Sequence, residues 1–334
     1  RRGLFSGAKK NMLTISIIIP VFNEEDSLKE LHREISAVAE ANQYQVEYVF
    51  IDDGSTDRSW SVLSELADSD SRVQCIRFRR NFGKAAALRA GAETATGSLL
   101  VTMDADLQDD PAELPSMLEK LGDDYDLISG WKQVRHDPIG KTVPSKVFNW
   151  LVGFLTGVKL HDHNCGFKLY RREIFDEVKL YGEMHRFVPV LAHAKGFRVG
   201  EIPVNHRARE HGVSKYGWSR LPKGFLDLLT VSFLTGFNQR PQHVIGALGL
   251  FSLILGSAGI AYMTAYWMLR VSFDAFGGWD PVHQRPLLVY SLGAFLLGTQ
   301  LLCMGFLAEL IVARGQESRE PYSIRTQRGG SREE

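Results

Sequence analysis

Carboxylate side chains recur directly after apolar runs in the first third of the chain. Three such clusters occur: Asn23-Glu24, Asp52-Asp53 and Asp104-Ala105-Asp106. Alternating carboxylates such as Asp104 and Asp106 suit a divalent cation, which prefers oxygen ligands. A cation held in this way can neutralise a diphosphate as it leaves. The chemistry indicated is transfer from a diphosphate-linked donor, although an Asp-x-Asp pattern alone also occurs in acidic surface loops.

The elements around these clusters are expected to bring them together. From residue 14 onward, apolar runs alternate with turns and helical faces, and Ile15–Val21 has the composition of a strand buried on both faces. This alternation predicts an α/β domain with a Rossmann-like, mostly parallel sheet and right-handed crossovers. Ligands of such sheets bind at the carboxyl ends of the strands. The three clusters are therefore predicted to line one site.

Two segments near the C-terminus are long and apolar enough to cross a membrane. Residues 244–269 and 287–308 contain no charged side chain, and at about 1.5 Å per residue each can cross a hydrocarbon core of roughly 30 Å. Basic residues flank the pair on its outer ends, which predicts a multi-pass cell-membrane protein with cytoplasmic termini and catalytic domain. Buried central helices are the alternative.

The segment 221–238 carries an apolar stripe too interrupted to span a membrane. It predicts a helix lying in the membrane surface or, alternatively, an amphipathic core helix. The expected parts are an N-terminal extension (1–13), an α/β catalytic domain (14–220), a juxtamembrane amphipathic helix (221–242), two transmembrane helices within 243–313 (about 244–269 and 287–309) and a cytoplasmic basic tail (314–334).

Charge and cysteine content exclude other classes of protein. The 39 Lys and Arg residues balance 39 Asp and Glu residues, which argues against nucleic-acid binding. Three scattered cysteines do not predict a disulfide framework. His161, His163 and Cys165 alternate, so on a strand they would share one side and could bind zinc. A structural zinc site would need further ligands of this kind, which the sequence lacks.

Four motifs follow in order along the predicted domain: Ile19-Pro20-Val21-Phe22-Asn23-Glu24, Asp52-Asp53-Gly54-Ser55-Thr56-Asp57, Asn81-Phe82-Gly83-Lys84 and Asp104-Ala105-Asp106-Leu107-Gln108-Asp109-Asp110-Pro111. Together they resemble the family 2 glycosyltransferases with a GT-A fold. More narrowly, the chain resembles polyprenyl-phosphate sugar transferases, namely dolichol-phosphate mannose synthases and bacterial bactoprenol glucosyltransferases. The resemblance covers about residues 14–220, and the two terminal spans are similar to the second subgroup.

The resemblance implies a nucleotide-sugar site with Mg²⁺ or Mn²⁺. Asp106 would bind the metal, with Asp104 beside it contacting the nucleotide. Arg209, Ser214 and Lys215 resemble the basic loop that closes over the diphosphate in the family; a solvated basic loop is the alternative. The implied donor residues are Pro20, Phe22, Asn23, Glu24, Asp53, Lys84, Asp104, Ala105, Asp106, Gln108, Arg209, Ser214 and Lys215.

The resemblance also implies an acceptor site. Lys141 and Ser145 match positions for the lipid phosphate, with Arg135 as a second basic candidate, and Asp162 matches an acidic residue beside the reacting centre. Because the second pKa of a phosphate is near 6, the acceptor is largely a dianion at neutral pH and needs no strong base. Asp162 is therefore interpreted as orienting the acceptor; a general base is the alternative.

The implied activity is an inverting transfer of glucose from UDP-glucose onto undecaprenyl phosphate at the cytoplasmic membrane face. Mannose from GDP-mannose is the second donor to consider. A non-catalytic scaffold that binds lipid or nucleotide is the alternative from another class. A processive polysaccharide synthase would need a Gln-x-x-Arg-Trp stretch, which this sequence lacks. Paired membrane helices are compatible with a homo-oligomer.

Overall fold

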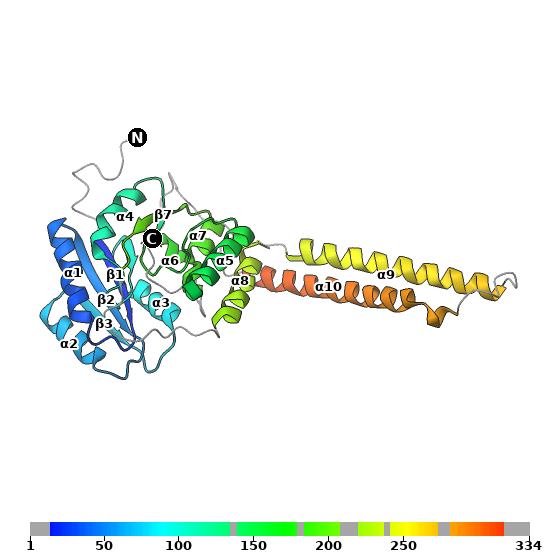
Figure 1. The fold of residues 1–334 in the computed structure, drawn as a ribbon, viewed down its shortest axis with the longest axis horizontal. Coiled ribbons are helices and arrows are strands. Elements are labelled where there is room, and N and C mark those ends of the chain that lie inside the picture. Colours follow the sequence, from blue (N-terminus) through cyan, green and yellow to red (C-terminus); the bar gives the residue numbers. More distant parts are fainter. Residues whose placement is uncertain are drawn as a thin grey trace, which may run out of the picture. The chain divides into compact units, whose positions relative to one another are not determined.

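A computed structural model describes residues 14–133, 139–178, 184–207, 220–236, 241–272 and 281–316. The chain divides into two compact units, Arg1–Thr235 and Gly236–Glu334. The first unit contains a sheet covered by helices, and the second contains two long helices (Figure 1).

The first unit is built on a mostly parallel sheet whose described strands follow the order β3-β2-β1-β4-β6-β5-β7. β1 pairs in parallel with β2 and β4, and β2 pairs in parallel with β3. This arrangement confirms the predicted α/β class. The strands are β1 (Thr14–Val21), β2 (Gln45–Asp52), β3 (Val73–Arg77), β4 (Leu99–Thr102), β5 (Leu127–Lys132), β6 (Lys168–Arg171) and β7 (Val199–Val204).

β6 is the strand that breaks the parallel pattern. It lies between β4 and β5 and runs antiparallel to both, with Lys168 opposite Thr102 and Ser129. The amino end of β6 therefore meets the carboxyl ends of β4 and β5 at one edge of the sheet. β1 and β2 end at the same edge, since they run parallel to β4. All polar clusters singled out in the sequence lie at this edge.

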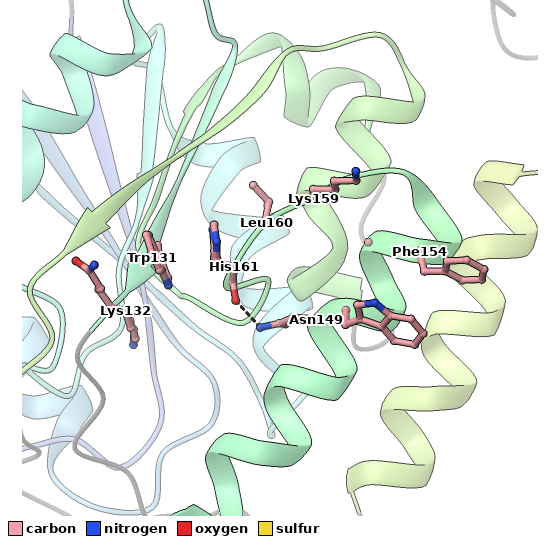
Figure 2. Close-up of a pocket in the computed structure, with 10 residues that line it drawn as sticks. Trp131, Lys132, Asn149, Phe154, Lys159, Leu160 and His161 are labelled. Carbon is pink, nitrogen blue, oxygen red and sulfur yellow. Dashed lines mark hydrogen bonds between the residues drawn. The ribbon is translucent and has the colours of Figure 1, made fainter.

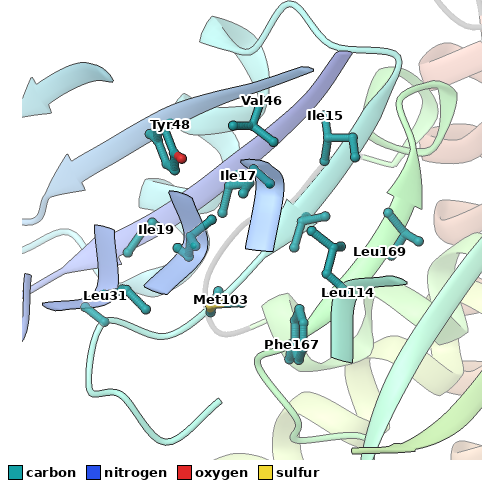
Figure 3. Packing of buried hydrophobic residues seen from close by; sticks show 14 of the residues in the cluster. Ile15, Ile17, Ile19, Leu31, Val46, Tyr48, Met103, Leu114, Phe167 and Leu169 are labelled. Atoms are coloured by element: carbon teal, nitrogen blue, oxygen red, sulfur yellow. The ribbon is translucent and has the colours of Figure 1, made fainter. Parts of the chain in front are cut away.

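Helices cover both faces of the sheet, because the strand side chains alternate between two apolar clusters. Ile17 and Ile19 belong to the first cluster, which Figure 3 shows packed with Tyr48 and Leu31, whereas Ile18 belongs to the second. The first cluster includes residues of α1 (Leu28–Ala41), α2 (Ser59–Ser69) and α4 (Leu114–Leu121), and the second includes residues of α3 (Lys84–Thr94), α6 (Glu173–Glu177) and α7 (Val188–Ala194). In Figure 1, α1 and α3 lie on opposite sides of the strands.

Two further helices share a third cluster. α5 (Ile139–Thr156) contributes Val152 to it, and α8 (Arg220–Gly236) contributes Leu228 and Val231. Phe225 and Leu226 of α8 are exposed. Within the predicted stripe over 221–238, Leu228 is therefore buried while Phe225 is exposed. α8 therefore combines a packed core face with an exposed apolar face, and the division after Thr235 places it in the first unit.

The second unit contains the helices α9 (Pro241–Ser272) and α10 (Pro286–Gln316), with a short turn, η5 (Val282–Gln284), before α10. Both helices are long and apolar enough to cross a membrane, over Gln242–Ser272 and Pro286–Leu310. They pack closely at glycines: a Cβ on Gly249 would lie 2.8 Å from the backbone nitrogen of Leu302. The unit is thus a tight helical hairpin.

Candidate functional site

The loops after β1 and β2 are hydrogen-bonded to each other. Asn23 has a left-handed backbone (φ 55°), a conformation that Asn tolerates better than most residues. Its Oδ1 accepts a hydrogen bond from the backbone N–H of Thr56 (2.8 Å), and its own N–H donates to the Ser55 hydroxyl (3.0 Å). The N–H of Ser55 donates to Asp52 (2.8 Å). The two loops therefore form one frame.

Asp53 joins a third loop to this frame. Its carboxylate is 4% exposed and accepts hydrogen bonds from the N–H groups of Phe82 (2.7 Å) and Gly83 (2.9 Å). Burial raises the pKa of Asp53, against the lowering effect of these two bonds. The neighbouring Gly54 has φ 73°, and a Cβ there would lie 2.5 Å from the Arg80 backbone. Only glycine fits this close approach.

Asp104 is held by cations at the end of β4. The ammonium of Lys84, at the start of α3, donates to Asp104 Oδ1, and the N–H of Asp104 donates to Asp109 (3.3 Å). Burial favours the neutral form of Asp104, but Lys84 and Lys132 outweigh it and hold its pKa below the usual range. The Nζ of Lys132 in turn lies 3.3 Å from the Oδ1 of buried Asp109. Asp104 is therefore a carboxylate at neutral pH.

Asp106 lies two residues further on, in a tight turn. It is 9% exposed, and its Oδ1 accepts a hydrogen bond from the N–H of Gln108 (3.3 Å). Leu107 between them has φ 59°, which turns the chain sharply. The Gln108 amide lies 3.5 Å from His206 Nε2 and donates to the Arg207 carbonyl (3.4 Å). This turn is anchored to the segment after β7.

The structure places ten predicted donor residues along this one edge: Pro20, Phe22, Asn23, Glu24, Asp53, Lys84, Asp104, Ala105, Asp106 and Gln108. Asp104 and Asp106 offer the carboxylate oxygens that a divalent cation prefers, although the ammonium of Lys84 already pairs with Asp104. Within the described residues no group of three or more His, Cys, Asp or Glu side chains forms a metal site. A cation held here would complete its coordination with phosphate oxygens.

Asp162 lies in the loop that precedes β6. It is almost fully buried, and its Oδ1 accepts a hydrogen bond from the N–H of Asn164 (3.0 Å). The preceding residue, His161, stacks on Trp131 with 4.2 Å between ring centroids, and its N–H donates to Glu201 of β7 (2.9 Å). Glu201 also bonds His161 Nδ1. Glu201 and Trp131 thus fix the start of the loop that carries Asp162.

A cavity of about 890 Å³ opens beside this loop, between the end of β5 and helix α5 (Figure 2). One part of its lining is apolar and another is cationic. Trp150 and Phe154 of α5 stack on each other and are 67% and 73% exposed. Asn149 donates to the His161 carbonyl, but its buried Oδ1 has no partner among the described residues. The lining residues are Trp131, Lys132, Gln133, Asn149, Trp150, Gly153, Phe154, Lys159, Leu160 and His161.

The predicted acceptor and loop residues are only partly described. Ser145 lies half-buried on α5, and Lys141 belongs to the first turns of the same helix. Arg135, Arg209, Ser214 and Lys215 lie outside the described residues. For these four positions, the predicted roles stay predictions.

The alternative of a zinc site at His161, His163 and Cys165 is not supported. The three residues lie in a loop, because β6 begins only at Lys168, so they do not share one side of a strand. His161 stacks on Trp131, whereas His163 and Cys165 are buried. Burial raises the pKa of the Cys165 thiol to about 12, so the thiolate that zinc requires is disfavoured.

Sequence reasoning missed Trp131, Lys132, Lys168, Glu201 and the aromatic pair on α5. Trp131 and Glu201 meet at His161 only when β5 and β7 pair, whereas Trp150 and Phe154 are four residues apart on one helix and stack there. Lys168 did carry a local signal, since it interrupts an apolar run at Phe167–Tyr170. A charge in such a run is a buried charge whenever the run forms an interior strand.

Comparisons with known proteins point to one family. Residues 16–179 match the profile of Glycosyl transferase family 2. The chain is 40% identical over 304 residues (90% of this chain, 88% of the other) to dodecaprenyl-phosphate galacturonate synthase of Rhizobium johnstonii. It is 35% identical over 298 residues (89% and 88%) to undecaprenyl-phosphate 4-deoxy-4-formamido-L-arabinose transferase of Klebsiella pneumoniae.

Among solved structures, the fold is similar to that of glucosyl-3-phosphoglycerate synthase from Mycobacterium tuberculosis, in complex with Mn²⁺, UDP and phosphoglyceric acid. The TM-score is 0.54 at 19% identity, covering 67% of this chain and 80% of that chain. At this identity the likeness concerns the GT-A fold.

Proposed function

The chain belongs to glycosyl transferase family 2, and from this premise we propose that it moves a sugar from a UDP-linked donor onto undecaprenyl phosphate at the cytoplasmic face of a membrane. It is a GT-A fold enzyme of the polyprenyl-phosphate sugar transferase group. Glucose is the sugar implied by the sequence resemblance. The names of the relatives add galacturonate and 4-deoxy-4-formamido-L-arabinose as candidates.

The observation that carries the proposal is the bonded frame at the ends of β1, β2 and β4. Asn23, Asp53 and Asp104 come from three separate loops, and each is fixed by hydrogen bonds or by an ion pair. A frame fixed before the donor arrives avoids the entropic cost of ordering these groups on binding. It supports a nucleoside site along β1 and β2, with the diphosphate near Asp104 and Asp106.

Asp104 and Asp106 would hold Mg²⁺ or Mn²⁺, which would neutralise negative charge on the departing diphosphate. Lys84 already supplies positive charge at the same place, because its ammonium contacts Asp104. Positive charge placed where the leaving group develops negative charge stabilises the transition state.

The acceptor side needs to orient a reactant more than to activate it. A phosphate dianion can attack the anomeric carbon without losing a proton, so positioning supplies most of the rate acceleration. Asp162 is suited to this role, since it is buried and bonded within a loop fixed by Glu201 and Trp131. A single displacement gives inversion, so an α-linked donor yields a β-linked lipid product.

The cavity beside α5 is suited to the lipid end of the acceptor. Trp150 and Phe154 offer exposed aromatic faces to isoprene units, while Lys132 and Lys159 supply positive charge at its polar lining. An amphipathic anion matches both parts of the lining. Lys141 and Ser145 stay candidates for the phosphate, because α5 carries them as well as the aromatic pair.

The membrane part of the proposal rests on α9 and α10. Both are long and apolar enough to cross a membrane, and the basic residues on their outer flanks favour cytoplasmic ends. A cytoplasmic active site would have direct access to nucleotide-sugars. Cysteine labelling in intact cells would test this, since a probe at the short segment after Ser272 should react from outside and a probe near Arg325 should not.

Transfer itself can be tested with purified full-length protein in detergent micelles containing undecaprenyl phosphate. We would supply UDP-glucose, UDP-galacturonate and UDP-4-deoxy-4-formamido-L-arabinose in turn, with Mn²⁺ or Mg²⁺, and score the labelled lipid product. We expect one donor to be strongly preferred and the product to have the anomeric configuration opposite to that of its donor, which is β for an α-linked donor such as UDP-glucose. Binding of donor and lipid without any product would favour the scaffold alternative, and a product that retains the donor's configuration would contradict single displacement.

A further inference from the structure

Lys168 is a buried cation that has no role in the account above. It begins β6, opposite Thr102 and Ser129, at the sheet edge that carries the site. Its neighbours Phe167 and Leu169 point into the first apolar cluster (Figure 3). Because side chains alternate along a strand, Lys168 points to the opposite face of the sheet.

The ammonium of Lys168 has few partners. The side chain is only 3% exposed, and its Nζ donates one hydrogen bond, to the backbone carbonyl of Cys165. Among the described residues, no carboxylate oxygen lies within 4.0 Å of it. An ammonium has three N–H donors. Two of them therefore have no acceptor in this part of the structure.

Such burial is unfavourable unless something compensates it. Moving an ammonium out of water without a counter-ion has a large free-energy cost. Burial lowers the pKa of Lys168, and the nearby charge of Lys84 lowers it further, while Asp162 and Asp104 act in the opposite sense. A buried, poorly compensated charge is typical of functional sites, where a ligand supplies the missing charge.

The surroundings of Lys168 indicate where that ligand would lie. The loop that leads to it from Asp162 passes against Asp104, since a Cβ on Gly166 would lie 2.5 Å from Asp104 Oδ2. The charges of Asp104 and Asp162 both favour the protonated form of Lys168. Asp104 belongs to the proposed donor site and Asp162 to the proposed acceptor site, so the bond exchanged between the substrates would lie near this edge of the sheet.

We propose that the Lys168 ammonium binds an anionic oxygen of the substrates beside the bond that is exchanged. The inference rests on the proposed transfer and adds a binding residue to it. Two sources can supply this oxygen: a carboxylate on the donor sugar, or a phosphate group of the donor or acceptor. In either case Lys168 stays protonated and forms no covalent bond, and its two open N–H donors gain acceptors.

The test compares the wild type with Lys168→Met, which keeps the length of the side chain and removes its charge. A pair of donors shows which oxygen Lys168 binds. UDP-galacturonate and UDP-galactose differ only at C6, which is a carboxylate in the first and a hydroxymethyl group in the second. If Lys168 binds the sugar carboxylate, kcat/KM falls about 10- to 100-fold for the uronate donor alone. If it binds a phosphate oxygen, both donors lose by a similar factor. An unchanged kcat/KM, within threefold on every accepted donor, would overturn the inference.

A stability measurement separates binding from a structural role. Replacing a poorly compensated buried charge with an apolar side chain of similar volume should leave the melting temperature unchanged or higher. A marked fall in the melting temperature, together with lost activity, would instead assign Lys168 a structural role and overturn the proposal. Lys195→Met, an exposed position at the end of α7, is the matched control and should change neither quantity.

Calorimetric titration of UDP-galacturonate and UDP tests Lys168 without requiring turnover. In the carboxylate case, Lys168→Met should weaken binding of UDP-galacturonate by at least about tenfold and leave UDP binding intact. If Lys168 binds a phosphate of the donor, the variant should bind both UDP-galacturonate and UDP more weakly. If the wild type transfers no sugar but Lys168→Met still weakens binding in either of these ways, the proposed function fails while the Lys168 site stands. If neither affinity changes and transfer proceeds normally, only the Lys168 inference fails.

Discussion

On the proposed donor side of the sheet edge, at the ends of β1, β2 and β4, polar groups are bonded to one another. On the proposed acceptor side, around β6 and α5, buried polar groups have fewer partners among the described residues. Asn23 and Asp53 bond neighbouring loops, and Asp104 pairs with Lys84. Across the edge, Lys168 has a single hydrogen bond and the Oδ1 of Asn149 has none among the described residues. The aromatic pair of α5 is largely exposed.

The difference indicates two modes of recognition. A bonded frame binds a rigid, polar nucleotide with little rearrangement. Hydrogen-bond donors without acceptors and exposed aromatic rings instead suit a ligand that supplies both negative charge and apolar surface. The comparison implies that donor-side substitutions should reduce stability, and that acceptor-side substitutions should reduce function more than stability.

The largest effect is expected from Asp106→Ala. Loss of the carboxylate predicted to bind the metal should reduce kcat by about 10²–10³-fold, because charge stabilisation at a leaving group contributes on this scale. Turnover would be measured at saturating donor and lipid over a range of Mn²⁺ concentrations. Asp124→Asn, at an exposed position, is the control. Full activity of Asp106→Ala would contradict a catalytic metal bound by this carboxylate.

Asp53→Ala should lower stability on the donor side. It leaves the N–H groups of Phe82 and Gly83 without their acceptor, at a cost of about 2–4 kcal/mol in the free energy of unfolding. Thermal unfolding in detergent would measure the change, with exposed Asp68→Ala as the control. An unchanged melting temperature would mean that the loops hold together without this carboxylate.

A pH-dependent effect is expected from His163, which is fully buried on the acceptor side. Burial, assisted by Lys168, lowers its pKa to about 4, whereas an unfolded histidine titrates near 6.5. Between these values the unfolded chain binds more protons, so this contribution falls as the pH is lowered, by about 3 kcal/mol in all from pH 7 to below 4.

His163→Gln should remove this part of the acid sensitivity, so its melting temperature should vary less with pH than that of the wild type. Exposed His193→Gln is the matched control and should keep the wild-type profile. Parallel profiles for His163→Gln and the wild type between pH 7 and 4 would contradict a neutral, buried His163.

A smaller effect is expected from Trp150→Ala and Phe154→Ala. Removing either aromatic face should raise the KM for undecaprenyl phosphate by about tenfold, the equivalent of 1–2 kcal/mol of lost contact. The KM for the donor and the melting temperature should change little, since both rings are largely exposed. Val147→Ala, an exposed position on the same helix that does not line the cavity, should behave as the wild type.

Most of the donor side could be predicted from the sequence. The clusters at Asn23, Asp53 and Asp104 each lie within a few residues of the strand that positions them, so a local pattern was enough. The α/β class followed from the same alternation of apolar runs and turns, and two helices able to span a membrane were found at the predicted places.

The acceptor side could not be predicted in the same way, because its contacts join distant parts of the chain. Trp131 meets His161, and His161 meets Glu201, only after β5 and β7 pair. The short antiparallel strand β6 places Lys168 at the same edge of the sheet. No periodic pattern in the sequence predicted that β6 runs antiparallel to its neighbours. The choice between a membrane-surface helix and a core helix for α8 was also left open by the sequence, since burial of Leu228 and Val231 depends on contact with α5.

The division of the site is tested most directly by crossed binding measurements. Equilibrium binding of UDP with Mn²⁺, and of undecaprenyl phosphate, would be measured for Asp106→Ala and for a Trp150→Ala/Phe154→Ala double variant. We expect Asp106→Ala to lose affinity for UDP alone and the double variant to lose affinity for the lipid alone. Equal losses of both ligands in either variant would contradict a site with separate donor and acceptor sides.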